Sequence, residues 1–322
     1  MQHLITAFCL PGHESMLASS VSTLRSAMSF YSNTYTCSYP FDSFKVVFVD
    51  EMPAQRFDSA SLCLATTDLL HGEDAIDQVY ETRHALSHAL VCQWIGIDMY
   101  QKYWPDTWLI NGLSLYITGQ FMRKLFGNND YRYRLKKDME RVLDMDNGTM
   151  PPICQPHNPD PPDASTLLFM NLKAPLVLHI LDRQLCKSGT SVSLIRILPK
   201  IFLTVLSATQ YEYKGLSTQG FLKMCRKVSG LDPRPFAEQW ILGSGCPRFG
   251  FSASFNRKKM AVEISMRQES PAWQVNEGNE VMKLLRRPVE FFEVRPCQEL
   301  KLVCKVCSFT PLGPNDHSDT RG

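Results

Sequence analysis

The order of hydrophobic and polar positions divides the chain into a long helical part and a shorter β-rich part. Over most of the chain, apolar residues recur about every three to four positions, which is typical of helices that bury one face. The segments predicted to be helical are 13–33, 75–103, 106–126, 130–144, 164–187, 191–208, 217–229 and 233–243. Two short apolar runs, 44–50 and 61–66, predict buried strands, and the proline-rich segment 145–163 predicts a loop.

The pattern changes after residue 245. Residues 249–267 alternate between apolar and polar side chains, which predicts a β-hairpin. We therefore predict an α+β, mainly α chain with three parts: a helical domain over 1–245, the β-rich start of a following sandwich over 246–309, and a disordered tail over 310–322. One or two hairpins do not form a stable sandwich alone, so we expect the natural protein to continue in both directions.

Composition and charge exclude several classes of protein. The 322 residues are 44% hydrophobic and 20% charged, which is typical of a globular chain. The 34 basic and 32 acidic side chains nearly balance, so the bulk charge predicts neither nucleic acid nor an anionic membrane as a partner. Because no apolar run reaches about 18 residues, we expect no membrane-spanning helix.

The eleven cysteines predict reduced thiols. Their number is odd and most lie in apolar runs, which favours a cytosolic or nuclear protein over a secreted one. Only Cys304 and Cys307 have the spacing of a metal site, with Cys297 as the next candidate ligand, and zinc needs about four ligands. The alternation of residues 300–307 favours a strand there instead.

The strongest chemical signal lies in two segments, His88-Ala-Leu-Val-Cys-Gln-Trp-Ile-Gly96 and Trp104-Pro-Asp-Thr-Trp-Leu-Ile-Asn-Gly112. They resemble the motif of the gluzincin zinc aminopeptidases, His-Glu-x-x-His-x-Trp-x-Gly followed by Trp-Leu-x-Glu-Gly. The spacing matches without a gap. The positions that match beyond His88 are Gln93, Trp94, Gly96, Trp108, Leu109 and Gly112. The resemblance implies a gluzincin, thermolysin-like catalytic-domain scaffold.

The catalytic positions of this motif carry unsuitable residues. In the family, zinc is held by two histidines and a glutamate, and those positions are His88, Cys92 and Asn111 here. The general base, a glutamate in the motif, is replaced by Ala89, which cannot accept a proton. Loss of a general base lowers a rate by roughly 10²–10⁴. The resemblance therefore implies a protein that is not an enzyme and that holds no metal or cofactor at these positions.

The resemblance extends to both sides of the motif. Upstream, the Gly-Ala-Met-Glu-Asn loop of the family falls on residues 55–59, so the glutamate that holds the substrate amine becomes Asp58. Downstream, the oxyanion-stabilising tyrosine becomes Asn171. Phe236-Ala-Glu-Gln-Trp240 resembles the close of the helical domain, with Trp240 at the tryptophan position of the family's Phe-x-x-Trp. The apolar positions persist while the polar catalytic ones are replaced together, which favours a fold kept for packing.

This pattern of losses resembles the aminopeptidase-like subunits of the general transcription factor TFIID. That resemblance implies a nuclear, non-catalytic scaffold that binds other TBP-associated factors and core promoter DNA, supports assembly of the RNA polymerase II preinitiation complex, and has no membrane partner. The alternative is a divergent zinc metallo-aminopeptidase.

Other interpretations stay open at this point. His84 and His88 also form a pair four residues apart, but their use as ligands would move the rest of the motif out of register. Residual zinc binding through His88 and Cys92, and a cysteine-protease arrangement of these two residues with Asn111, are further possibilities. A basic cluster gives candidate phosphate contacts. Its members are Arg132, Arg134, Lys136 and Lys137.

Overall fold

The structure is a computed structural model. It describes residues 4–146, 148–187, 192–206, 214–246, 248–258, 261–269 and 292–294. The predictions for Cys304 and Cys307 and for the tail 310–322 lie outside the described residues. The chain separates into two compact units, Met1–Gly245 and Cys246–Gly322, and each is described by itself.

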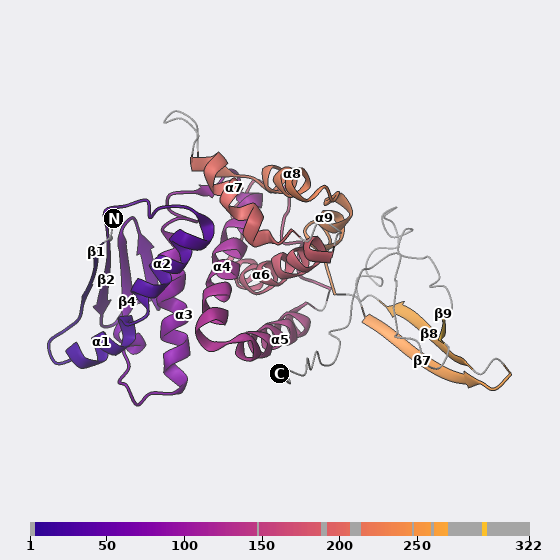
Figure 1. Cartoon of the computed structure of the whole chain (residues 1–322), viewed down its shortest axis with the longest axis horizontal. Coiled ribbons are helices and arrows are strands. Elements are labelled where there is room, and N and C mark those ends of the chain that lie inside the picture. The colour runs from indigo at the N-terminus through magenta and orange to yellow at the C-terminus, as the bar shows by residue number, and fades with distance from the viewer. Residues whose placement is uncertain are drawn as a thin grey trace, which may run out of the picture. The chain divides into compact units, whose positions relative to one another are not determined.

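The first unit begins with a small mixed sheet, which lies to the left in Figure 1. Its strands are β1 (Leu4–Phe8), β2 (Ser43–Val49), β3 (Arg56–Ser59) and β4 (Leu62–Thr66), in the order β1-β2-β4-β3. The first two pairs are parallel, and β3 runs antiparallel to β4. The strand predicted over 44–50 is present, but only one of its faces is buried. Neither β1 nor β3 was predicted from the sequence.

Helices make up most of the first unit, which confirms the prediction of a mainly α fold. They are α1 (Glu14–Val21), α2 (Leu24–Tyr35), α3 (Asp77–Cys92), α4 (Thr107–Phe126), α5 (Asn128–Met145), α6 (Ala164–Lys187), α7 (Leu194–Leu206), α8 (Thr218–Ser229) and α9 (Arg234–Trp240). Short 3-10 turns lie at Thr67–Leu69 and Trp104–Asp106, and the two-residue strands β5 (Tyr100–Gln101) and β6 (Gly215–Leu216) pair in parallel. In Figure 1 the helices after α4 form a body beside the sheet.

Two predicted helices differ clearly from the structure. The prediction for 13–33 divides into α1 and α2, because Ser20 and Ser22 turn their hydroxyls onto the carbonyls of Met16 and Ser19 and so compete with regular helix bonding. The prediction for 75–103 ends at Cys92. The chain turns there, and Gly96 takes a φ of 126°, which residues with a side chain rarely adopt.

The centre of the core is α4. Trp108 is fully buried, and its indole nitrogen donates to the hydroxyl of Thr218 at 2.9 Å. Gly112 faces α6 so closely that an added Cβ would lie 2.8 Å from the Cβ of Ala174. The tryptophan and the glycine of the sequence motif therefore have packing roles, in which α4 is held against α6 and α8.

Helix α6 carries a long apolar segment. Its segment Ala164–Cys186 is long and apolar enough to cross a membrane by length and composition alone. In the structure it packs against α4 and α5 and buries Phe169, Leu178 and Leu181. These contacts are those of a core helix in a globular domain.

The second unit is β-rich. Strands β7 (Arg248–Asn256) and β8 (Ala261–Glu269) form the predicted hairpin. A third strand, β9 (Phe292–Val294), pairs antiparallel with β8 and was not predicted.

Candidate functional site

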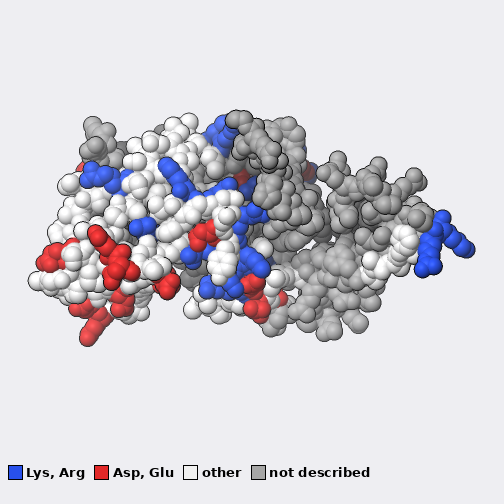
Figure 2. All heavy atoms as spheres, turned by 60° about the horizontal axis from the view of Figure 1, so that its bottom comes forward, with Lys and Arg blue, Asp and Glu red and all other residues white. Residues whose placement is uncertain are grey.

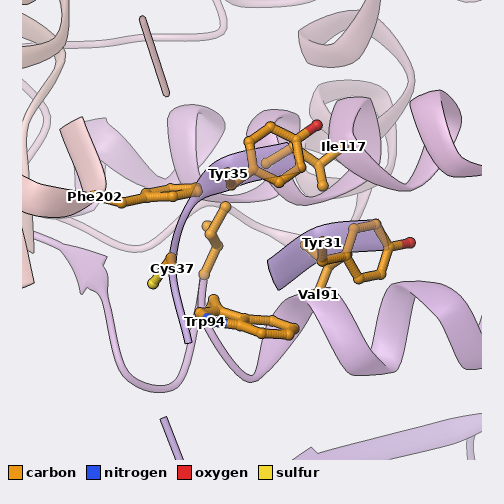
Figure 3. A pocket seen from close by; sticks show the side chains of 8 residues that line it. Tyr31, Tyr35, Cys37, Val91, Trp94, Ile117 and Phe202 are labelled. Atoms are coloured by element: carbon orange, nitrogen blue, oxygen red, sulfur yellow. The ribbon is translucent and has the colours of Figure 1, made fainter. Parts of the chain in front are cut away.

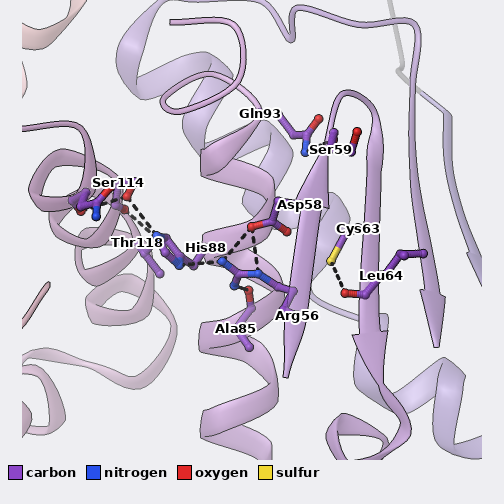
Figure 4. Close-up of polar contacts among 11 residues, drawn as sticks. Arg56, Asp58, Ser59, Cys63, Leu64, Ala85, His88, Gln93, Ser114 and Thr118 are labelled. Atoms are coloured by element: carbon purple, nitrogen blue, oxygen red, sulfur yellow. Dashed lines mark hydrogen bonds and ion pairs between the residues drawn. The ribbon is translucent and has the colours of Figure 1, made fainter. Parts of the chain in front are cut away.

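The predicted site residues meet where α3, α4, α6 and the β3–β4 hairpin approach one another. His88 lies on α3, and both of its ring nitrogens have partners (Figure 4). Its Nδ1 is 2.9 Å from Nη2 of Arg56, and its Nε2 is 3.0 Å from Oγ of Ser114 on α4. Ser114 in turn donates to the carbonyl of Asn111 at 2.9 Å.

These contacts define the proton positions on His88. A guanidinium only donates hydrogen bonds, so Nδ1 must be the acceptor and carries no proton. The proton of the neutral ring is then on Nε2, and this N–H donates to Ser114. Burial, followed by the charge of Arg56, lowers the pKa of His88 well below its usual range. A neutral ring with both nitrogens bonded has no free lone pair for a metal.

Arg56 was not identified from the sequence, although it is central to the site. It lies two residues before Asp58 on β3, so both side chains share one face of the strand. Its Nε and Nη2 lie 3.0 and 2.9 Å from Oδ2 of Asp58, and its Nη1 donates to the carbonyl of Ala85. The signal that could have found it is this i, i+2 spacing of opposite charges, which by itself occurs too often to be specific.

Asp58 lies directly across from Cys63 of β4 in the strand register. Burial, and after it the charge of this carboxylate, raises the pKa of the Cys63 thiol. Burial, and after it the charge of Asp58, raises the pKa of the Cys92 thiol to about 12. A thiol at neutral pH is a poor metal ligand and a poor nucleophile, because both roles need the thiolate.

Asn111 and Asn171 are brought together from α4 and α6. The Asn111 amide nitrogen donates to the side-chain oxygen of Asn171 at 2.9 Å. Ala89 is completely buried. The predicted positions therefore form one cluster, in which most polar groups bond to one another.

The family implies a zinc ion, and the donor set of this cluster does not fit one. His88 offers no free lone pair, Cys92 is held as a thiol, and the guanidinium of Arg56 places a positive charge against the first ligand position. Within the part of the chain that the structure describes, no group of three or more His, Cys, Asp or Glu side chains could hold a metal ion.

His84, the other histidine of the predicted alternative pair, lies away from the network. Its ring stacks on Tyr80 with centroids 5.9 Å apart, and its centroid is 6.3 Å from that of His88. The guanidinium of Arg134 also lies over the ring of Tyr80, 3.1 Å from its centroid. Arg134 also binds Asp130 at 3.0 Å, so this candidate phosphate contact has strong partners within the protein.

The other three basic candidates lie exposed on α5. Lys136 and Lys137 are 3.8 and 3.2 Å from Glu140. Exposed ion pairs of this kind contribute little, so their lysines can exchange partners easily. Figure 2 shows basic side chains over the middle of one face of the first unit and acidic ones at its left end. Exposed acidic residues just before and within the start of α3 include Asp68, Glu73, Asp74, Asp77 and Glu81.

A small pocket lies near the end of α3 and shares no residue with the His88 cluster. Aromatic side chains form its walls, and the rings of Tyr35 and Phe202 are 5.8 Å apart. In Figure 3 the hydroxyls of Tyr31 and Tyr35 point to the side opposite the sulfur of Cys37. The lining is therefore almost wholly apolar and offers no catalytic group.

Residues 20–189 match the model of the peptidase family M1 domain. The chain belongs to peptidase family M1. The sequence resemblance to zinc aminopeptidases is thereby confirmed. A solved structure, aminopeptidase A of Legionella pneumophila in complex with aspartic acid, superposes on this M1 fold with a TM-score of 0.61 at 19% identity, over 81% of this chain and 29% of that chain. Identity this low shows the fold alone.

Curated relatives are similar over more of the chain. Transcription initiation factor TFIID subunit 2 of Schizosaccharomyces pombe is 42% identical over 286 residues, which is 88% of this chain and 24% of that protein. The subunit of the same name from Saccharomyces cerevisiae is 33% identical over 271 residues, or 82% of this chain and 19% of that protein. The resemblance of this M1 chain to a TFIID subunit is confirmed, and the chain spans a quarter or less of the length of these relatives.

Proposed function

We propose that this chain is the non-catalytic, aminopeptidase-like part of a TFIID subunit and serves as a scaffold. The observation that carries the proposal is the hydrogen-bond network at the residues that resemble the family's metal-binding positions: His88 binds Arg56 and Ser114, and Asn111 binds Asn171. The similarity to TFIID subunit 2 over most of the chain supports the same proposal. In this role the protein acts in the nucleus, binds other TBP-associated factors and supports assembly of the preinitiation complex.

Metal content and turnover test the non-catalytic part. Purified protein is analysed for zinc and assayed with an aminoacyl reporter substrate, with an active M1 aminopeptidase as the positive control. We expect zinc far below one ion per chain and no hydrolysis above background. Stoichiometric zinc together with turnover that His88→Ala abolishes would favour the divergent metallo-aminopeptidase.

Affinity purification tests the partner part. The chain carries a tag within its natural full-length context, and co-purifying proteins are identified by mass spectrometry. We expect the other TBP-associated factors to be enriched over an untagged control. Absence of all of them from the purified material would contradict the scaffold role.

Helix α5 supplies the promoter contact in this proposal. Arg132, Lys136 and Lys137 are exposed there, and lysines in weak surface pairs can bind phosphate, which gives salt-dependent affinity without base specificity. The test compares Lys136→Glu/Lys137→Glu with Lys223→Glu/Lys227→Glu on α8, which changes the net charge equally. We expect only the α5 variant to lower promoter affinity several-fold. Equal effects of the two variants would contradict a role of α5.

A further inference from the structure

We infer that Arg56 is a built-in cation that performs the structural role of a metal ion at this site, since it holds α3 to the sheet and keeps a divalent ion away from His88. This inference goes beyond the proposed scaffold function, because a scaffold could lack activity without any internal cation. It assigns a role to a residue that belongs to none of the catalytic positions of the family.

The contacts of Arg56 resemble those of a bridging cation. One guanidinium from β3 bonds to the carboxylate of Asp58 on its own strand, to the carbonyl of Ala85 on α3 and to Nδ1 of His88 on α3. The side chains of Arg56 and Asp58 are each only 16% exposed. Three electron-rich groups from two elements thus converge on one positive charge. A bound metal ion would provide the same positive charge for such a set of groups.

The shape of the side chain suits this role. A guanidinium carries five N–H donors in a rigid plane and keeps its charge at any pH that the fold tolerates. It can therefore bind Asp58 with one edge and still reach Ala85 and His88. The ammonium of a lysine is a point charge on a flexible stem and cannot hold three partners in fixed directions.

The same contacts oppose metal binding. A zinc ion at His88 would need a free nitrogen lone pair, and the two nitrogens are bonded to Arg56 and to Ser114. It would also approach a guanidinium whose nitrogen is 2.9 Å from the ring. Removal of the guanidinium frees Nδ1 of His88 and leaves Asp58 as a nearby carboxylate. The cluster then gains two groups that can bind a metal ion, and it loses a positive charge.

The experiment uses the purified full chain and measures the melting temperature and the zinc affinity of the variants Arg56→Met and Arg56→Lys. The control is Arg83→Met, because Arg83 is a half-buried arginine of α3 whose guanidinium lies over the ring of Phe126, 5.7 Å from its centroid. We expect Arg56→Met to melt several degrees below the control and Arg56→Lys to lie between. We also expect Arg56→Met to bind zinc at least about tenfold more tightly than the wild type, with a zinc-dependent rise in melting temperature.

A spectroscopic measurement keeps the inference testable if Arg56→Met does not fold. Nitrogen-15 spectra of histidine-labelled wild type should contain the signal of a neutral ring with its proton on Nε2, and this signal is assigned to His88 by its loss in His88→Gln. In Arg56→Lys this signal should shift toward a mixture of tautomers. An unchanged signal in Arg56→Lys, or equal stability and equal zinc affinity of Arg56→Met and Arg83→Met, overturns the role of Arg56. Such a result leaves the proposed scaffold function standing if the wild type is free of zinc and inactive.

Discussion

Two contacts of α4 lie less than one turn apart and are built in opposite ways. At Gly112, α4 approaches α6 through small and apolar groups, and Ala174 fills the space that a side chain would need. At Ser114, α4 instead meets α3 through a chain of hydrogen bonds that continues to His88 and Arg56. The first contact depends on shape and the second on charge and proton positions.

Under the proposed non-catalytic role, the difference shows how an M1 fold can keep its architecture without a metal. The apolar contact persists because Gly112, which forms it with Ala174, is a packing residue as well as a motif residue. The polar contact cannot persist in part, because each buried donor or acceptor left without a partner costs about 1–3 kcal/mol. Replacement of several polar groups by one connected network lowers that cost, although Oδ1 of Asp58 is left without a hydrogen-bond partner among the described residues.

The largest effect is expected next to the apolar contact. Lys173 precedes Ala174 on α6 and binds Asp146 at 2.8 Å, with side chains 6% and 0% exposed. Lys173→Met would leave a buried carboxylate without its cation, so we expect the free energy of unfolding to fall by about 3–5 kcal/mol. Urea unfolding measures this loss. The double variant Lys173→Met/Asp146→Leu should recover part of it, and no recovery would contradict the assignment of the loss to an unpaired charge.

The shape of the apolar contact is tested by Gly112→Ala. The new methyl group would overlap Ala174, so we expect a loss of about 2–3 kcal/mol from overpacking. Gly119→Ala on the same helix is the matched control, because its Cβ would meet the nearest atom, of Tyr131, at 3.4 Å. The control should be neutral or stabilised by up to about 1 kcal/mol through helix propensity. A loss as large in Gly119→Ala would refute the packing explanation.

The polar contact is tested by Ser114→Ala. This change removes the acceptor of the His88 Nε2 proton, and we expect a loss of about 1–2 kcal/mol. Ser114→Thr keeps the hydroxyl and provides the control. If calorimetric unfolding of Ser114→Ala matched the wild type, the proton positions assigned to His88 would be wrong.

The smallest effect on stability at neutral pH is expected at His179, a histidine that lies outside both contacts. Burial, followed by the charge of Arg183, lowers the pKa of His179 from 6.5 to about 4. The unfolded chain therefore binds the extra proton first, so His179 contributes full stability above about pH 6.5 and loses it as the pH falls toward 4. We expect His179→Gln to flatten this acid-side decline in melting temperature without changing the value at pH 8. An unaltered slope would show that other groups cause the decline.

Much of the fold could be predicted from the sequence, but the polar site only in part. Helices such as α4 and α6 show a long apolar period, and their bounds agree closely with the prediction. The strands β1 and β3 escaped prediction because they are short edge strands with mixed exposure. The motif spacing located His88, Cys92 and Asn111, but it could not show that Arg56, some thirty residues away, binds the first of them.

The sequence by itself determined which side chains stand at the positions that resemble the family's catalytic ones: Ala89 has no group that accepts a proton, and Cys92 and Asn111 bring a thiol and an amide. It also determined the helical scaffold, because apolar periodicity is a local property that the chain carries with it. Only the tertiary structure decided which partners the polar side chains at these positions bind. Hydrogen bonds such as those of Arg56 with His88 and of Asn111 with Asn171 join residues far apart in the chain, and their partners are set by how the helices and strands pack.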